Sequence, residues 1–93
     1  MLLISGSALP LQSRRAELIS GALEITRETV NDDGCLYYKF SQDLETGEII
    51  STELWRDREA LEAHMAHDHT IKFFSRLDGV FAEPPVMTEL EIN

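Results

Sequence analysis

The hydrophobic periodicity of this chain changes from one segment to the next, and that order restricts the folds open to it. Apolar side chains recur every three or four residues over 13–30, which predicts an amphipathic helix. They alternate over 35–42 and again over 49–55, which predicts two strands. The acidic, glycine-containing stretch 43–48 between them predicts a hairpin with a longer loop.

Shorter signals complete the series of elements. The others that we expect are a strand at 2–9, a helix at 57–66, a further helical stripe at 70–81 and a last strand at 86–92. Ser13, Asp57 and Thr70 are placed to cap the three helices. Pro10 ends the first strand, in which Gly6 marks a bulge or a close approach of another chain segment.

The resulting order is strand, helix, strand, strand, helix pair, strand. It predicts an α+β protein with a ferredoxin-like, split βαβ fold, in which helices lie under a four-stranded antiparallel sheet. The 93 residues are the size of one domain, so we expect a single domain over 1–93. On the first helix, the side chains expected to face the sheet are Ala16, Ile19, Ala22, Leu23, Thr26 and Val30.

Both strands of the hairpin carry apolar residues on both of their faces. Alternation places Leu36, Tyr38 and Phe40 on one face of the first strand and Tyr37 on the other, and the strand at 49–55 repeats this two-sided pattern. Helices can cover only one face of such a sheet. The uncovered face would expose more apolar surface than a monomer usually does, which predicts a homodimer.

The charge balance argues against several kinds of partner. Eight Lys and Arg residues against 17 Asp and Glu give a net charge of -9, which repels nucleic acids and anionic membranes. The apolar opening 1–4 is far shorter than the ~20 residues of a membrane span, and one cysteine, Cys35, permits no internal disulfide. We therefore expect a cytoplasmic protein with neither a nucleic acid nor a membrane as partner.

The middle of the chain contains residues with a distinctive spacing. It reads Gly-Cys-Leu-x-Tyr-x-Phe at 34–40, Glu-x-Trp at 53–55, Glu-Ala-Leu-x-Ala-His at 59–64, His69 and Phe-Phe at 73–74. In these positions the chain resembles the antibiotic biosynthesis monooxygenase family, small dimeric α+β barrels built of ferredoxin-like subunits. The resemblance implies a pocket between the helices and the sheet of each subunit. It also implies oxygenation of a quinol, a phenolic or an anthrone-like aromatic by dioxygen, with no cofactor.

Two ionisable residues in this region are the candidates for catalysis. Glu53 and Trp55 share one face of their strand, and His64 lies on the apolar face of the following helix, so the three could converge. A Glu–His pair can hold an imidazole ready as a proton acceptor, which predicts His64 as the base and Glu53 as its orienting partner. A deprotonated quinol or anthrone is electron-rich enough to give an electron to dioxygen.

Other side chains are candidates for substrate binding. Trp55, Tyr38 and Phe73 are expected to form the walls of an apolar pocket that orients the aromatic ring. Ser5, on the first strand, is placed to donate a hydrogen bond to a substrate oxygen.

Two other functions remain open at this point. Glu53 and His64 can equally form a structural pair in a dimer that binds a small molecule without chemistry. They can also shuttle a proton in an isomerase, whose charged substrate would need a cationic anchor. The cations near in sequence are Arg56, Arg58, Lys72 and Arg76.

The three histidines form a His-x-x-His-x-His sequence at 64–69, which raises the question of a metal site. Their spacing argues against one, because His69 follows a break in the helix and Asp68 takes the place of the usual i, i+4 partner. We therefore expect no metal ligands among the site residues.

Overall fold

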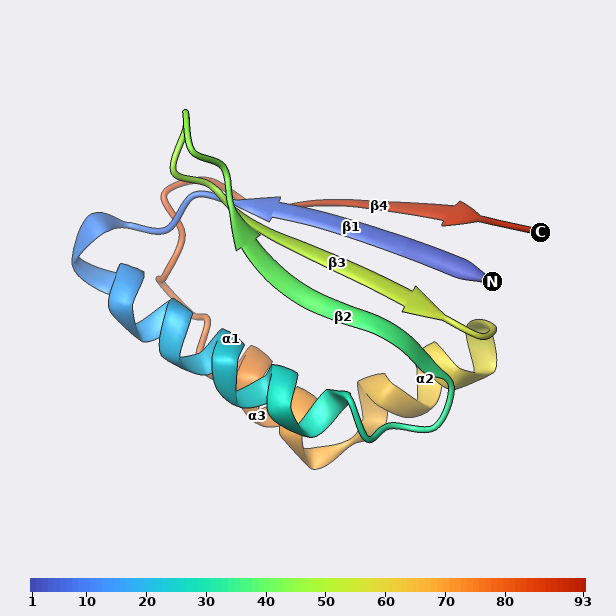
Figure 1. Cartoon of the computed structure of the whole chain (residues 1–93). Helices are drawn as coiled ribbons and strands as arrows, with labels where there is room; N and C mark the ends of the chain where they lie inside the picture. The colour runs from blue at the N-terminus through green and yellow to red at the C-terminus, as the bar shows by residue number, and fades with distance from the viewer.

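The computed structural model describes residues 1–93 (Figure 1). Its elements are β1 (Leu2–Ala8), the short 3-10 helix η1 (Gln12–Arg14), α1 (Arg15–Thr29), β2 (Cys35–Gln42), β3 (Ile49–Trp55), α2 (Arg58–Ala66), α3 (Asp68–Ser75) and β4 (Val86–Glu91). None of the helices has both the length and the apolar character that crossing a membrane requires.

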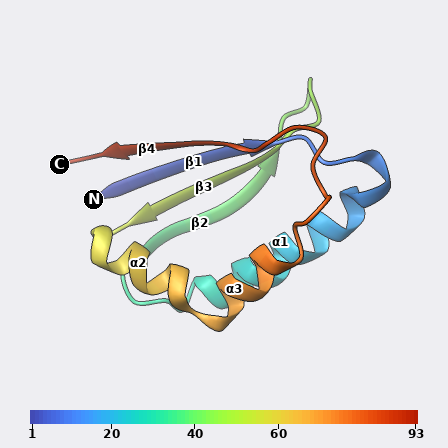
Figure 2. The same ribbon diagram turned by 180° about the vertical axis from the view of Figure 1, so that it is seen from behind.

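The four strands form one sheet in the order β2-β3-β1-β4, and every neighbouring pair is antiparallel. The three α-helices lie on one face of this sheet, and the other face is bare of helices (Figures 1 and 2). This arrangement confirms the predicted α+β, ferredoxin-like fold. It also leaves β4 as an edge strand whose six residues are all exposed.

The core lies between the sheet and the helices. Its buried apolar side chains are Leu2, Ile4, Leu18, Ala22, Ile25, Tyr38, Ile49, Trp55, Ala60, Leu61, Phe73 and Val80. Trp55 has no exposed surface at all, and it lies opposite Leu2 of β1 and Cys35 of β2 in the sheet register. Burial of aromatic and aliphatic side chains of this size is the main contribution to the stability of the fold.

The face of α1 that packs on the sheet differs from the expected one. The buried side chains are Leu18, Ala22, Ile25 and Thr29, at a spacing of four, three and four residues. Of the side chains expected to face inward, Ile19, Leu23 and Val30 are exposed. The helix carries apolar residues over a wide arc of its surface, so more than one face could pack inward. The packed face includes Gly21, where α3 comes close to α1: a Cβ atom on Gly21 would lie only 3.4 Å from the ring of Phe73.

The helix starts were only partly predicted. Asp57 caps α2 as expected, because its side chain accepts a hydrogen bond from the backbone N–H of Ala60 at 2.8 Å. Ser13 does not cap α1, since it lies within the preceding 3-10 turn and the N-cap residue is Arg14. Thr70 does not start α3, which begins two residues earlier after His67, and its buried hydroxyl lies inside the molecule.

The third helical stripe is also shorter than expected. It was predicted to run to residue 81, but α3 ends at Ser75. Gly79 has a φ of 70°, which turns the chain out of the helical direction. Val80 and Phe81 then run alongside the end of β1, where the backbone N–H of Leu11 donates to Val80 at 2.8 Å.

An irregularity in β2 changes which of its side chains face the helices. The register against β3 shifts between Cys35 and Tyr37, as a β-bulge does. Tyr38 and Phe40 keep the inward face that was predicted, whereas Leu36 is 52% exposed. Simple alternation could not reveal the extra residue that turns Leu36 outward.

Gly6 confirms the close approach that was expected in the first strand. A Cβ atom at this position would lie 2.6 Å from the sulfur of Met87 and 2.6 Å from Oγ of Ser51, which any side chain would displace. Gly6 therefore lets the side chains of two neighbouring strands meet above it, at the rim of the pocket described next.

Candidate active site

An apolar pocket of about 100 Å³ lies between the sheet and α3. We call it the Glu53 pocket, and among its lining residues are Gly6, Phe40, Glu53, Phe73, Phe74 and Met87. Phe74, which is 52% exposed, lies at its solvent side. Glu53 is the only ionisable side chain among the lining residues.

Glu53 is buried on the inward face of β3. Its Oε1 accepts a hydrogen bond of 3.0 Å from Nε1 of Trp55, two residues further along the same face of the strand. Burial raises the pKa of the Glu53 carboxyl, and the Trp55 N–H opposes that rise only in part. The second carboxyl oxygen has no hydrogen-bond partner in the protein, so it is free to meet a ligand.

Tyr38 lies directly opposite Glu53 in the register between β2 and β3. Burial raises the pKa of its phenol above the usual range, and the negative charge of Glu53 adds to the effect. Tyr38 therefore stays neutral at any physiological pH. It packs edge-on against Phe40, with ring centroids 5.8 Å apart, and so supports the pocket wall.

His64 has a different partner from the one expected. Its Nδ1 lies 2.8 Å from Oδ2 of Asp32, in the turn between α1 and β2, whereas Glu53 bonds to Trp55. The predicted Glu53–His64 pair is therefore not formed. The sequence offered no reason to choose Asp32, because the segment Asn-Asp-Asp-Gly at 31–34 has the composition of a turn.

The imidazole of His64 lies behind the pocket and not in its lining. It is 2% exposed and packs against Trp55, with centroids 4.6 Å apart and planes inclined at 36°. Burial lowers its pKa, against the opposing effect of Asp32. Trp55 thus lies between the two ionisable candidates, since its ring packs against His64 and its N–H donates to Glu53.

The structure separates the expected site residues into three groups. Glu53 and Phe73 line the pocket. Tyr38, Trp55 and His64 pack around it without lining it. Ser5 is exposed and alternates with the buried Ile4, so it lies on the bare face of the sheet, away from the pocket. Ser51, which lies opposite Gly6 in the register and lines the pocket, carries a hydroxyl that the sequence analysis did not select for this role.

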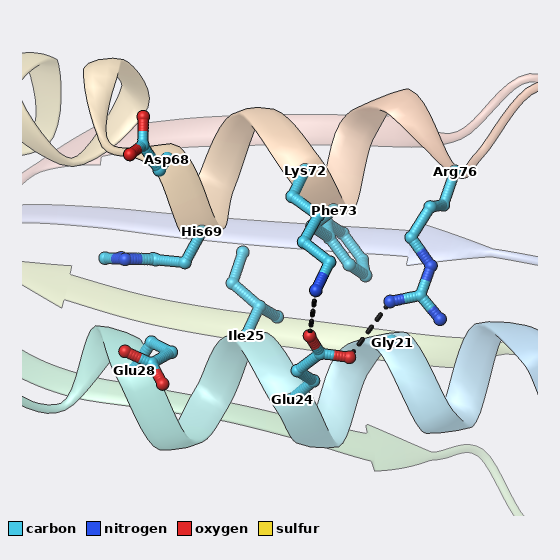
Figure 3. A pocket seen from close by; sticks show the side chains of 9 residues that line it. All are labelled: Gly21, Glu24, Ile25, Glu28, Asp68, His69, Lys72, Phe73 and Arg76. Atoms are coloured by element: carbon cyan, nitrogen blue, oxygen red, sulfur yellow. Dashed lines mark hydrogen bonds and ion pairs between the residues drawn. The ribbon is translucent and has the colours of Figure 1, made fainter.

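A second and more polar cavity, of about 290 Å³, lies between α1 and α3 (Figure 3). We call it the α1–α3 groove. Lys72 and Arg76 line it, and both bind Glu24, at 2.7 and 3.0 Å respectively. Glu24 offsets one of these two positive charges, and the acidic residues Glu28 and Asp68 also line the groove. The apolar Glu53 pocket, with one reactive carboxyl, is the better candidate for chemistry on an aromatic substrate.

Several solved structures share this fold over nearly the whole chain. Rv0793 of Mycobacterium tuberculosis is 22% identical, with a TM-score of 0.93 over 99% of this chain and 94% of that one. A conserved protein of Methanosarcina mazei is 19% identical, with a TM-score of 0.92 over 99% of this chain and 92% of that one. A candidate antibiotic biosynthesis monooxygenase of Deinococcus radiodurans is 26% identical, with a TM-score of 0.90 over 100% of this chain and 93% of that one.

The family itself is identified by sequence. The antibiotic biosynthesis monooxygenase family matches residues 11–76, which is most of the chain. The chain therefore belongs to this family, as its resemblance at 34–74 predicted. No curated protein matches it. Membership suggests a monooxygenase-like activity, and it names neither the substrate nor the reaction.

Proposed function

We propose that this protein is a monooxygenase that oxidises a small quinol or anthrone-like aromatic with dioxygen in the Glu53 pocket, without a cofactor. A quinol ionises by losing a phenolic proton, and an anthrone can do the same through its phenol tautomer. Family membership supports the reaction class. The observation that carries the proposal is a single carboxyl group, with a raised pKa and one free oxygen, in an otherwise apolar pocket.

The proposed role of Glu53 is that of the proton acceptor. A carboxylate with a raised pKa is a stronger base than an ordinary glutamate. An apolar pocket also contains little water that could compete with this carboxylate for the proton of the substrate. The Trp55 N–H holds one oxygen in place, so the other points to the ligand in a fixed orientation. This assignment moves the role of base from His64 to Glu53, and Trp55 takes the place of the orienting partner.

The oxidation that follows needs no external reductant. The substrate anion gives one electron to dioxygen, the two radicals combine to form a carbon–oxygen bond, and the oxygen–oxygen bond then breaks with release of water. A hydroquinone becomes a hydroxyquinone, and an anthrone becomes an anthraquinone. One oxygen atom enters the product and the other leaves as water, while the substrate supplies all four electrons. Glu53 returns its proton to the departing oxygen, and the second hydrogen of the water comes from the C–H bond of the oxygenated carbon, which breaks together with the oxygen–oxygen bond.

Oxygen uptake by the purified protein tests this proposal. We expect protein-dependent consumption of one dioxygen per molecule of hydroquinone or anthrone after autoxidation is subtracted. With ¹⁸O₂, one labelled atom should appear in the organic product. Uptake no faster than autoxidation across the panel, or formation of hydrogen peroxide without labelled product, would contradict the monooxygenase.

The alternatives predict other results in the same assay. A non-catalytic binding dimer would quench Trp55 fluorescence on adding an unreactive substrate analogue, with no oxygen consumed. An isomerase for an anionic substrate would need a cation in the pocket, and neither arginine nor lysine lines the Glu53 pocket. The α1–α3 groove contains Lys72 and Arg76, but Glu24 already binds both. The oxygenase is therefore the function that the pocket favours.

We further propose that the working unit is a homodimer formed through the bare face of the sheet. A row of apolar side chains crosses all four strands on that face, because Tyr37 opposes Leu54, Leu54 opposes Leu3, and Leu3 opposes Leu90. Tyr37 and Leu90 are 46% and 58% exposed in the single chain. A second copy would bury this row, which the helices leave open.

The substitution Leu54→Lys is expected to dissociate this dimer. It places a charge in the middle of the apolar row, where the partner's sheet would have to desolvate it. Analytical ultracentrifugation at micromolar concentration should change from twice 10.6 kDa for the parent to 10.6 kDa for the variant. Leu44→Lys is the matched control, since Leu44 is 95% exposed in the hairpin loop and its replacement should leave the dimer intact. A monomeric parent protein would contradict the proposal.

A further inference from the structure

Three imidazoles surround one carboxylate at the junction of α1, α2 and α3. We call these four residues, Asp32, His64, His67 and His69, the Asp32 cluster. Nδ1 of His64 lies 2.8 Å from Oδ2 of Asp32, and Nε2 of His69 lies 2.9 Å from the same oxygen. Nε2 of His67 lies 3.7 Å from the other oxygen, Oδ1. The ligand atoms of Asp32, His64 and His69 all fall within 4.8 Å of one another.

The fold brings these residues together from separate segments. Asp32 lies in the turn after α1, where its backbone N–H donates to Thr29 and its carbonyl accepts from Cys35. His67 has an extended backbone, with ψ at 148°, so the chain turns sharply between α2 and α3. This turn places His69 beside His64, with ring centroids 5.9 Å apart. The break in the helix before His69, which argued against a metal site in the sequence, is therefore what brings His69 to His64.

The buried negative charge of the Asp32 cluster favours the binding of a cation. The Asp32 side chain is 7% exposed, and no lysine or arginine binds it, because Arg56 pairs with Asp33 and Asp57 instead. A buried carboxylate normally has a cationic partner or a metal. Here the ring nitrogens of two histidines, Nδ1 of His64 and Nε2 of His69, converge on one of its oxygens.

The geometry points to a binding site for one divalent first-row transition-metal ion, of the Zn²⁺ class, held by Asp32, His64 and His69. Two imidazoles and a carboxylate suit such an ion, whereas Mg²⁺ and Ca²⁺ prefer oxygen ligands throughout. Metal–ligand bonds of ~2.0–2.2 Å separate tetrahedral ligand atoms by roughly 3.3 Å. The nitrogen–oxygen distances need to grow by only about half an ångström to admit the ion. His67 or water completes the coordination.

The site is separate from the Glu53 pocket, and one of its ligands reaches the surface. His69 lies at one end of the α1–α3 groove, while Lys72 and Arg76 point to Glu24 further along it (Figure 3). The groove therefore leads to the His69 side of the Asp32 cluster, away from both cations. The ion would fix the turn after α1 to both later helices, which is a structural role, so the inference does not depend on the proposed oxygenase.

Metal binding by the full chain, stripped with a chelator, tests this inference. Titration with Zn²⁺ in a calorimeter is expected to give one equivalent per chain, and the ion should remain bound through gel filtration. Co²⁺ should give visible absorption bands of a four- or five-coordinate site. Asp32→Asn and His69→Gln should each weaken Zn²⁺ binding by more than about 100-fold, since losing even an outer-shell partner costs roughly 10–100-fold.

The choice of variants separates metal binding from folding. The amide of Gln can donate a hydrogen bond to Asp32 as Nε2–H of His69 does, so His69→Gln keeps the contact and the fold while it removes the ligand. Asp33→Asn is the matched control, because it removes the same charge from the neighbouring residue, whose side chain is 92% exposed. Absence of stoichiometric binding by the folded parent would overturn the inference. Binding that survives both ligand variants, or that only His67→Gln abolishes, would also overturn it.

Discussion

The variant Glu53→Gln is expected to lose oxygen uptake by about 10²–10⁴-fold, the usual contribution of a general base, while the folded protein becomes more stable at neutral pH. Glutamine has nearly the same shape, and its carbonyl oxygen can accept the hydrogen bond that Trp55 Nε1 donates at 3.0 Å. It cannot accept the proton of a phenol. A residue kept for structure would show the opposite trend, because its replacement would lower stability.

The pH dependence of both quantities follows from the raised pKa of Glu53. The folded protein holds this proton to a higher pH than the unfolded chain does. The stability contribution of Glu53 is therefore complete below the pKa of the unfolded chain, and it is lost as the pH rises through the raised pKa of the folded state. The gain in melting temperature of Glu53→Gln over the parent should accordingly grow with pH across that interval.

The activity also depends on the ionisation of Glu53, but it should rise with pH where the stability of the protein falls. Only the ionised carboxylate accepts a proton, so kcat/KM of the parent should rise with pH through a pKa above the usual glutamate range. Glu62→Gln, an exposed change of the same kind on α2, is the control and should alter neither quantity. Full oxygen uptake by Glu53→Gln would rule out Glu53 as the base.

The fold could be predicted from the sequence because hydrophobic periodicity determines element type and order. The two-residue period over 35–42 and 49–55 and the helical period over 13–30 are strong local signals, and Asp57 is a clear cap. What failed depended on tertiary contacts. α3 selected the face of α1 through Gly21, and a bulge turned Leu36 outward.

The site was less predictable for the same reason. Alternation placed Glu53 on the inward face of β3, beside Trp55. The partner of His64 is 32 residues away in sequence, in a turn whose composition indicates only a turn. Choosing between Glu53 and Asp32 as that partner required knowing that the fold brings Asp32 to within 2.8 Å of His64, whereas Glu53 bonds to Trp55. The face on which Ser5 lies could have been predicted from the sequence, because strand alternation places Ser5 opposite its neighbours Ile4 and Gly6, which face the core.

The second large effect is expected at His64, and it concerns stability and not rate. In chelator-treated protein, His64→Ala should lower the free energy of unfolding by about 3–5 kcal/mol, through the loss of a hydrogen bond to a buried carboxylate and the cavity left by an aromatic ring. The substitution leaves the Asp32 carboxylate, 7% exposed, with only His69, at 2.9 Å, of its two close imidazole partners. It also opens a cavity against Trp55, whose ring centroid is 4.6 Å from that of His64.

Urea denaturation measures this loss, and oxygen uptake per folded molecule separates it from catalysis. Because His64 does not line the Glu53 pocket, the fraction of His64→Ala that remains folded should keep the parental kcat within a few-fold. His67→Ala is the matched control: it removes the same side chain from a 47% exposed position, 3.7 Å from Asp32, where we expect a change of less than about 1 kcal/mol. Loss of rate in a His64→Ala protein of unchanged stability would instead return the role of base to His64. In that case the Trp55 ring, which lies between His64 and Glu53, would have to move aside during turnover, since it now separates that imidazole from the pocket.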